Sequence, residues 1–214
     1  MPSGNVTALD LSAEALAPGQ AYASAVGASN ITFSIGSVYS LPFSDNTFDV
    51  AHASQVLGHL KDPVLAIKEM MRVVKSGGKV ALREVDVPTF SAFPWGEWIE
   101  KTVQIVTQHV LEEGAGNLRP GTSLKSQCRL AGADMERIVF TTGTWDFNRR
   151  QEREAFGRSW AERMRDSDNA RFGLRKGIVD QDGLQRIAKG WEDWVENEDA
   201  WLCVTNGEAL ITVV

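Results

Sequence analysis

The chain has 214 residues, which is enough for one α/β domain that carries a small insertion. Its net charge of −6 argues against a nucleic-acid partner, because phosphate binding requires a basic surface. No apolar run approaches the length of a membrane span, so we expect no membrane partner either.

The first half of the chain is predicted to alternate strands with helices. β-Branched and aromatic residues mark the strands, and Ser12 and Asp62 are typical helix N-caps, the second followed by a proline at the first helical position. This alternation predicts right-handed βαβ crossovers and a mostly parallel sheet. The predicted strands span residues 6–9, 31–35, 48–53 and 79–85, and the predicted helices span residues 12–25 and 62–74.

The pattern changes after Asp86, where two prolines frame a loop. Further along, aromatic and aliphatic residues recur at helical spacing in two stretches, which predicts two amphipathic helices. We expect a single domain over residues 1–214, divided into a first half of residues 1–86 and a second half of residues 87–214 with a helical insertion before the last strand. In this second half the predicted helices lie around residues 95–113, 156–164 and 184–195, and the predicted strands span 136–142 and 208–214.

Three segments of the first half carry a family resemblance. The loop and strand at residues 41–50, the segment at residues 56–63 and the helix end at residues 69–78 resemble the ubiquinone/menaquinone-type class I S-adenosylmethionine-dependent methyltransferases. Together they cover roughly residues 5–86, and the tryptophan-rich second half is similar, more loosely, to a microbial small-molecule branch of that family. The resemblance implies an α/β fold with a Rossmann-like sheet that is truncated at its N-terminus.

Three residues correspond to cofactor-binding positions of this family. Asp10 ends the first strand, where the family's acid binds ribose hydroxyls, and the glycine-rich turn that should come before it is not found in residues 1–4. Ser37, followed by Val38, stands where the family usually has an acid for the adenine amino group, and an uncharged hydroxyl accepts that hydrogen bond more weakly. We therefore expect Asp10, Ser37 and Val38 to be vestigial and the chain to use no cofactor, with S-adenosylmethionine as the alternative.

The resemblance also implies a gap in the sheet, because the family's first strand lies between its second and fourth. Removing a central strand exposes two ladders of backbone groups that must find partners. The sequence therefore predicts either direct pairing of the strands at residues 6–9 and 48–53 or self-association, and we expect a homodimer.

Four polar residues are predicted to lie near the ends of parallel strands. Ligands of open α/β sheets bind beyond the carboxyl ends of the strands, which makes these residues candidates for catalysis. A packed His52 and a turn-capping His59 are the structural alternatives. The candidate catalytic residues are His52, Gln55, His59 and Asp86.

Aromatic residues after the fifth and sixth strands are predicted to form a lid over the substrate, since large rigid rings make apolar pocket walls. Helical spacing assigns Trp160 and Trp191 to the core instead. A lid of this kind indicates a hydrophobic small-molecule substrate. The candidate substrate-binding residues are Trp95, Trp98, Trp145 and Phe147.

The two cysteines, Cys128 and Cys203, show no metal-ligand spacing. The N-terminus lacks a basic region followed by an apolar stretch, so no signal peptide is visible. We expect no metal site, reduced thiols and a cytoplasmic protein.

The leading functional hypothesis is a methyltransferase-like enzyme that has lost methyl transfer. It would act as a cofactor-independent cyclase, of the pericyclase or Diels–Alderase type, on a hydrophobic natural-product intermediate. Well-oriented intramolecular reactions gain on the order of 7–11 kcal/mol, so holding two ends of a substrate together is much of the catalysis. One alternative is an S-adenosylmethionine-dependent small-molecule methyltransferase with a truncated N-terminus, and another is a non-catalytic partner of an active methyltransferase.

Overall fold

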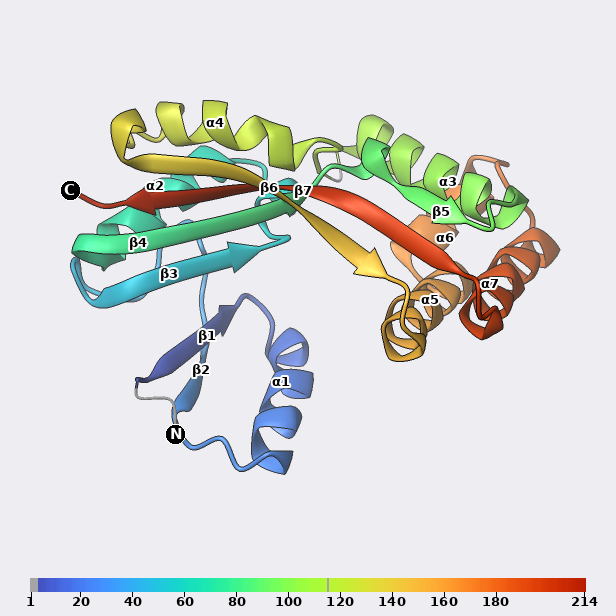
Figure 1. The fold of residues 1–214 in the computed structure, drawn as a ribbon, viewed down its shortest axis with the longest axis horizontal. Helices are drawn as coiled ribbons and strands as arrows, with labels where there is room; N and C mark the ends of the chain where they lie inside the picture. The colour runs from blue at the N-terminus through green and yellow to red at the C-terminus, as the bar shows by residue number, and fades with distance from the viewer. Residues whose placement is uncertain (1–3, 115) are drawn as a thin grey trace.

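The computed structural model describes residues 4–114 and 116–214 and has an α/β fold (Figure 1). Ser12 and Asp62 cap the first two helices as predicted, each with a side-chain oxygen that accepts backbone N–H groups. The helices are α1 Ala13–Ala25, α2 Pro63–Val73, α3 Glu97–Glu113, α4 Pro120–Leu130, α5 Arg150–Arg165, α6 Asp168–Arg175 and α7 Gln181–Glu196. The strands are β1 Val6–Asp10, β2 Ile31–Ile35, β3 Phe48–Ser54, β4 Val74–Val85, β5 Ser91–Phe93, β6 Ile138–Phe147 and β7 Trp201–Thr212.

The described strands form two separate sheets. β1 and β2 pair in parallel, with Val6 opposite Ile31. The larger sheet contains β3, β4, β7 and β5 in that order, and β6 also pairs with β7. β3 runs parallel to β4, whereas β7 runs antiparallel to β4, β5 and β6. The sheet is thus parallel in the first half of the chain, as predicted, and antiparallel where the last strand enters.

β1 and β3 do not pair, so the predicted direct pairing of residues 6–9 with residues 48–53 is wrong. Among the described strands, β1 pairs only with β2, and β3 pairs only with β4. The segment that connects β2 to β3 is bound to α2, because the guanidinium of Arg72 donates to the carbonyl oxygens of Leu41 and Phe43. This attachment holds the connecting segment between the two sheets, so β1 and β3 stay apart. Figure 1 shows the unit of β1, β2 and α1 set apart from the β3 edge of the larger sheet.

Two apolar clusters stabilise the chain. One lies between the larger sheet and helices α2 and α4, and it includes Leu82 and Ile211 from the strands. The other lies among α3, α5, α6 and α7, where the two predicted amphipathic stripes meet. Trp191 is 1% exposed and Trp160 stacks on it with ring centroids 5.9 Å apart, which confirms the predicted packing role of both.

The second half of the chain contains elements that the sequence pattern missed. α4, α6 and the three-residue β5 lie where no element was predicted. β6 continues to Phe147 and β7 begins at Trp201, because these two strands pair along their whole shared length. The predicted helical insertion before the last strand is confirmed, since α5, α6 and α7 lie between β6 and β7.

One face of the larger sheet is largely open, because α2 and α4 cover the opposite face (Figure 1). His52, Ala81, Leu210 and Val139 lie in register across the open face. Leu210 is 41% exposed and Val139 is 60% exposed. The accessible surface of the chain is 12164 Å², whereas a compact monomer of 23.5 kDa exposes about 9,800 Å².

The state of the cysteines and the length of the helices can be compared with the expectations of reduced thiols and of no membrane span. Cys128 is buried and Cys203 is half-buried, and both are free thiols. Burial raises the pKa of the Cys128 thiol to about 11, so this thiol stays protonated at neutral pH. None of the helices in the described part of the chain is both long and apolar enough to cross a membrane.

Candidate functional site

Polar side chains from three strands meet at the carboxyl end of β4. Gln55 directly follows β3, and Glu84 and Asp86 lie at the end of β4. Asn206 lies on β7 opposite Val85, the last residue of β4. The sequence therefore places Gln55, Glu84 and Asp86 correctly at strand ends, and the hydrogen bonds of each side chain indicate what it does there.

Gln55 has a left-handed backbone with φ of 58°, which is uncommon for a residue with a side chain. Its side-chain oxygen accepts the N–H of Val85 at 3.1 Å, and its Nε2 donates to Oδ1 of Asn206 at 3.2 Å. Asn206 is fully buried. The amide of Gln55 therefore joins β3 to β4 and β7, and it stabilises the strained turn rather than facing a ligand.

Glu84 is 1% exposed and binds the segment that follows Gln55. Its Oε1 accepts the N–H groups of Val56 and Leu57 at 2.9 and 2.8 Å, and its Oε2 accepts the N–H of Gly58 at 3.2 Å. Burial raises the pKa of the Glu84 carboxyl above its usual range, while these N–H groups and the nearby His59 act in the opposite direction. Glu84 thus holds a whole turn of backbone from inside the protein.

Asp86 is 3% exposed, and the N–H of Thr122 lies 3.2 and 3.3 Å from its two carboxylate oxygens. Thr122 is in the first turn of α4, whose N-cap residue Arg119 forms no side-chain cap. Asp86 therefore caps α4 from a distant strand, which also places its negative charge at the positive end of the helix. This arrangement favours a structural role for Asp86 over the predicted catalytic one.

The two candidate histidines lie apart. His59 ends a short 3₁₀ turn at Leu57–His59 and its side chain is exposed beyond the end of β3. His52 is exposed within β3, in register with Ala81 on the open face of the sheet. His59 is therefore the candidate catalytic residue that the strand ends present to solvent, whereas His52 belongs to the open face.

The cofactor-side residues keep part of a binding site. Asp10 is exposed at the end of β1, where its Oδ1 accepts the N–H of Ser12 at 3.0 Å. Its second carboxylate oxygen forms no hydrogen bond to any residue that the structure describes. Ser37 uses its hydroxyl oxygen to accept the N–H of Tyr39 at 3.2 Å, and Val38 packs against the cluster under α2. One carboxylate oxygen of Asp10 is thus available to a ligand.

Trp95 and Trp98 do not lie over the strand ends. Trp95 is 47% exposed and donates its Nε1–H to Glu100 at 3.0 Å. Trp98 packs edge-on against Trp191 of α7, with ring centroids 4.6 Å apart. Because α3 begins at Glu97 and packs on α7, it carries Trp98 into the helical half of the molecule.

Trp145 and Phe147 lie on β6, with ring centroids 6.3 Å apart. Phe147 stacks on Phe156 and joins the helical cluster. Trp145 lies beneath the guanidinium of Arg83, whose central carbon is 5.2 Å from the ring centroid. The four predicted lid residues therefore do not share one wall, and Trp145 is the one that contacts a residue near the end of β4.

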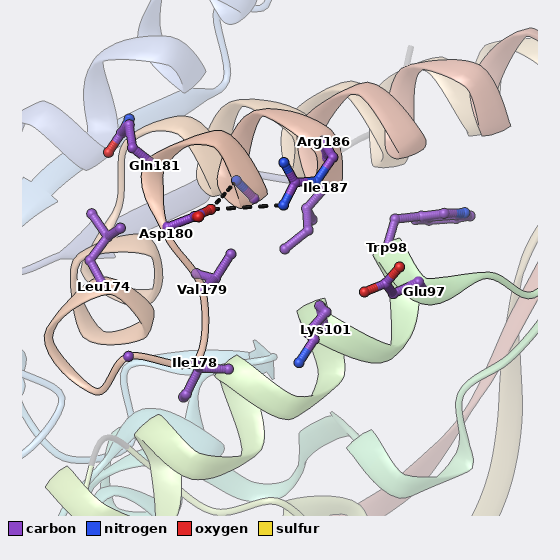
Figure 2. Close-up of a pocket in the computed structure, with 12 residues that line it drawn as sticks. Glu97, Trp98, Lys101, Leu174, Ile178, Val179, Asp180, Gln181, Arg186 and Ile187 are labelled. Carbon is purple, nitrogen blue, oxygen red and sulfur yellow. Dashed lines mark hydrogen bonds and ion pairs between the residues drawn. The ribbon is translucent and has the colours of Figure 1, made fainter.

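A pocket of about 840 Å³ lies in the helical half, between the start of α3 and the start of α7 (Figure 2). Trp98 and Ile187 contribute apolar surface to it. Asp180 accepts the N–H of Gly183 at 2.6 Å and lies 3.8 Å from the guanidinium of Arg186, so the acid at the rim has partners of its own. None of the candidate catalytic residues lines this pocket.

Similarity to known proteins agrees with this fold and these strand ends. A methyltransferase domain family matches residues 2–82. An uncharacterized methyltransferase of Schizosaccharomyces pombe is 32% identical over 185 residues, which covers 84% of this chain and 63% of that protein. These matches confirm the resemblance to methyltransferases, by the family model over residues 2–82 and by the yeast relative over most of the chain.

Bacterial methyltransferases are similar to the first half of the chain. The demethylmenaquinone methyltransferase of Anoxybacillus flavithermus is 40% identical over 92 residues, or 43% of this chain and 39% of that protein. The chain thus spans less than two thirds of the length of either relative.

Solved structures agree on the fold. A putative methyltransferase of Bacillus halodurans superposes with a TM-score of 0.54 at 15% identity and covers 98% of this chain and 84% of that one. The [4+2]-cyclase SpnF superposes with a TM-score of 0.51 at 21% identity and covers 96% of this chain and 66% of that one. At these identities the likeness concerns the methyltransferase fold alone.

Two features of this site were missed in the sequence. Arg83 and Glu208 form an ion pair at 3.3 Å on the open face, beside Trp145. Asn206, which holds Gln55, is the other. A polar Asn-Gly-Glu run inside an otherwise apolar last strand was the available signal, because such residues inside a strand require partners.

Proposed function

We propose that this chain is an S-adenosylmethionine-dependent methyltransferase that acts on a hydrophobic small molecule. The single observation that carries the proposal is the position of Asp10, an exposed acid with one uncommitted carboxylate oxygen at the end of a parallel strand. Support also comes from the relatives, which are named as methyltransferases. A homodimeric, cytoplasmic protein remains part of this proposal.

The cofactor-side residues Asp10, Ser37 and Val38 fit the ribose of S-adenosylmethionine better than its adenine. Asp10 has the geometry to accept a hydrogen bond from a ribose hydroxyl, and Ser37 and Val38 follow the neighbouring strand β2, where an adenine ring would lie. Ser37 offers the adenine amino group a neutral acceptor, because it has a second lone pair besides the one bound by Tyr39. When bound, S-adenosylmethionine supplies an electrophilic methyl group.

His59 is the residue that we propose for proton transfer. Its imidazole is exposed beyond β3, and the arrowheads of β1, β3 and β4 point toward the same side in Figure 1. An acceptor that loses a proton as it is methylated would give that proton to a ring nitrogen of His59. General bases of this kind contribute about 10²–10⁴-fold to the rate.

The acceptor that we propose is a quinol-like or phenolic small molecule. Two relatives are named as demethylmenaquinone methyltransferases and a third as a ubiquinone/menaquinone biosynthesis C-methyltransferase, and these names are the reason for the choice. Trp145 offers such a ring an apolar surface near the strand ends. Cyclisation remains a prediction, since a [4+2]-cyclase is similar to this chain in fold, whereas the similar sequences are named as methyltransferases.

The proposal is tested by following a labelled methyl group. The chain is incubated with methyl-labelled S-adenosylmethionine and 1,4-naphthalenediol as a quinol probe, and the organic extract is assayed. We expect label in the extract and a loss of about 10²-fold or more in rate for His59→Ala. Lys61→Ala changes an exposed residue two positions along and is the matched control.

Two results would contradict the proposal, the first its function and the second the role of His59. One is the absence of label in any organic product. The other is a transfer rate that His59→Ala leaves unchanged, which would remove the proton-transfer role while leaving methyl transfer in place.

A further inference from the structure

We infer that Glu84 is a positioning residue, whose carboxylate holds residues 55–59 in the conformation that presents His59 at the strand ends. The inference rests on the function proposed for His59. Glu84 acts through the segment, because its own carboxylate is 1% exposed and is turned to backbone N–H groups.

The segment requires an internal acceptor. Three consecutive backbone N–H groups, from Val56 to Gly58, point to the same side of the turn, and Leu57 and Gly58 are buried. Buried backbone N–H groups require an acceptor, and Glu84 is the acceptor of all three, so each would lose its protein partner without Glu84. The strained backbone of Gln55, with φ of 58°, precedes these residues and adds to the need for support.

The other side of the turn is also held. The carbonyl oxygen of Gly58 accepts the N–H of Asn117 at 2.8 Å. A side chain at position 58 would approach Pro120 to 3.0 Å, and a side chain at position 116 would collide with the carbonyl oxygen of Gly58, so the turn is packed against the segment that leads into α4. Asn117 thus binds the carbonyl oxygen of Gly58 while Glu84 binds the backbone N–H groups. These contacts on both sides of the turn fix the backbone conformation that leads into His59.

A carboxylate suits this role better than an amide. Both oxygens of Glu84 accept, whereas a glutamine would direct an NH₂ group at one of the backbone N–H groups. No Lys or Arg in the described residues forms an ion pair with Glu84. Its carboxylate is therefore left to act on the segment, and the nearby His59 lowers the pKa of that carboxyl against the effect of burial.

The experiment compares Glu84→Ala and Glu84→Gln with Asp86→Asn by amide hydrogen exchange of the cofactor-free chain. Asp86 is the matched control, because it is a second buried carboxylate on the same segment of chain but binds Thr122 instead. We expect exchange at residues 56–58 to rise by roughly tenfold or more in Glu84→Ala and by less in Glu84→Gln, which keeps one acceptor oxygen. Asp86→Asn should accelerate exchange at Thr122 and not at residues 56–58.

A second measurement separates positioning from mere stability. The imidazole NMR signals of His59 should move in both Glu84 variants, while those of His52 and His109 serve as internal references. Unchanged exchange at residues 56–58, or a His59 signal that Glu84→Gln leaves in place, would overturn the inference. Neither measurement uses S-adenosylmethionine, so failure of this inference is distinguishable from failure of the proposed methyl transfer. If Glu84→Ala does not fold, the same two measurements on Glu84→Gln decide the inference.

Discussion

At the scale of single residues, the strand ends are occupied mostly by side chains that bind backbone. Gln55, Glu84 and Asp86 bond respectively to β4, to the turn after β3 and to α4. The sequence could place these residues at strand ends from the strand pattern alone. The strand pattern could not reveal which side-chain oxygens of these residues accept backbone N–H groups, because the donors come from segments up to 36 residues away in the sequence.

The buried Glu84 predicts a pH dependence of stability. Its pKa is raised in the folded chain, chiefly by burial, so the protonated form is more favoured in the folded chain than in the unfolded chain at the same pH. The stabilisation from this group is therefore complete below the ordinary pKa of glutamate and is lost as pH rises through the raised folded pKa. Compared with Glu84→Gln, the wild type should gain stability as pH is lowered through that window.

Urea unfolding of both proteins at several pH values, from about 7.5 down to about 4.5, measures the difference in their unfolding free energies. The lower limit lies close to the ordinary pKa of glutamate. A difference in unfolding free energy that stays constant with pH, or that grows as pH rises, would contradict the assigned direction of the shift.

At the scale of elements, helices α5 and α7 were predictable, because their signal is local. The stripes on α5 and α7 repeat at helical spacing and they meet in the structure. β5 has three residues and carries no such pattern, and α4 receives its cap from Asp86 rather than from its own N-cap residue. Trp98 looked like part of a lid because nothing local shows that α3 packs on α7.

The roles of the tryptophans predict unequal costs of truncation. Trp191→Ala should lower the unfolding free energy by about 3–5 kcal/mol, because the ring is 1% exposed and its Nε1–H donates to Thr102. Trp95→Ala should cost far less, since its side chain is about half exposed. Urea denaturation of both variants checks this contrast, and equal losses would contradict the packing described for α7.

At the scale of the whole molecule, the chain exposes more surface than a compact protein of its mass. The excess over the expected area is about 2,400 Å², which is larger than the roughly 800 Å² that each partner contributes to a standard interface. The open face of the larger sheet and the unpaired edges of β1 and β3 account for part of it. The sequence pattern led to the expectation of self-association, but it could not show that β1 and β3 would stay apart.

We therefore expect the chain to self-associate at micromolar concentration. Leu210→Lys places a charge on the open face and should shift the chain toward monomer, whereas Leu130→Lys changes a similarly exposed leucine on α4 and should not. Sedimentation velocity over a range of concentrations checks this. A single monomeric species at all concentrations would contradict it.

The central claim is that this chain binds S-adenosylmethionine through Asp10. Calorimetric titration of the wild type, Asp10→Asn and Asp199→Asn with S-adenosylmethionine tests it most directly, since Asp199 is an exposed acid far along the chain. We expect binding to the wild type and to Asp199→Asn, and a loss of at least about tenfold for Asp10→Asn, because a charge-assisted hydrogen bond contributes about 1.5–3 kcal/mol. No binding to the wild type, or equal binding to all three proteins, would contradict the account.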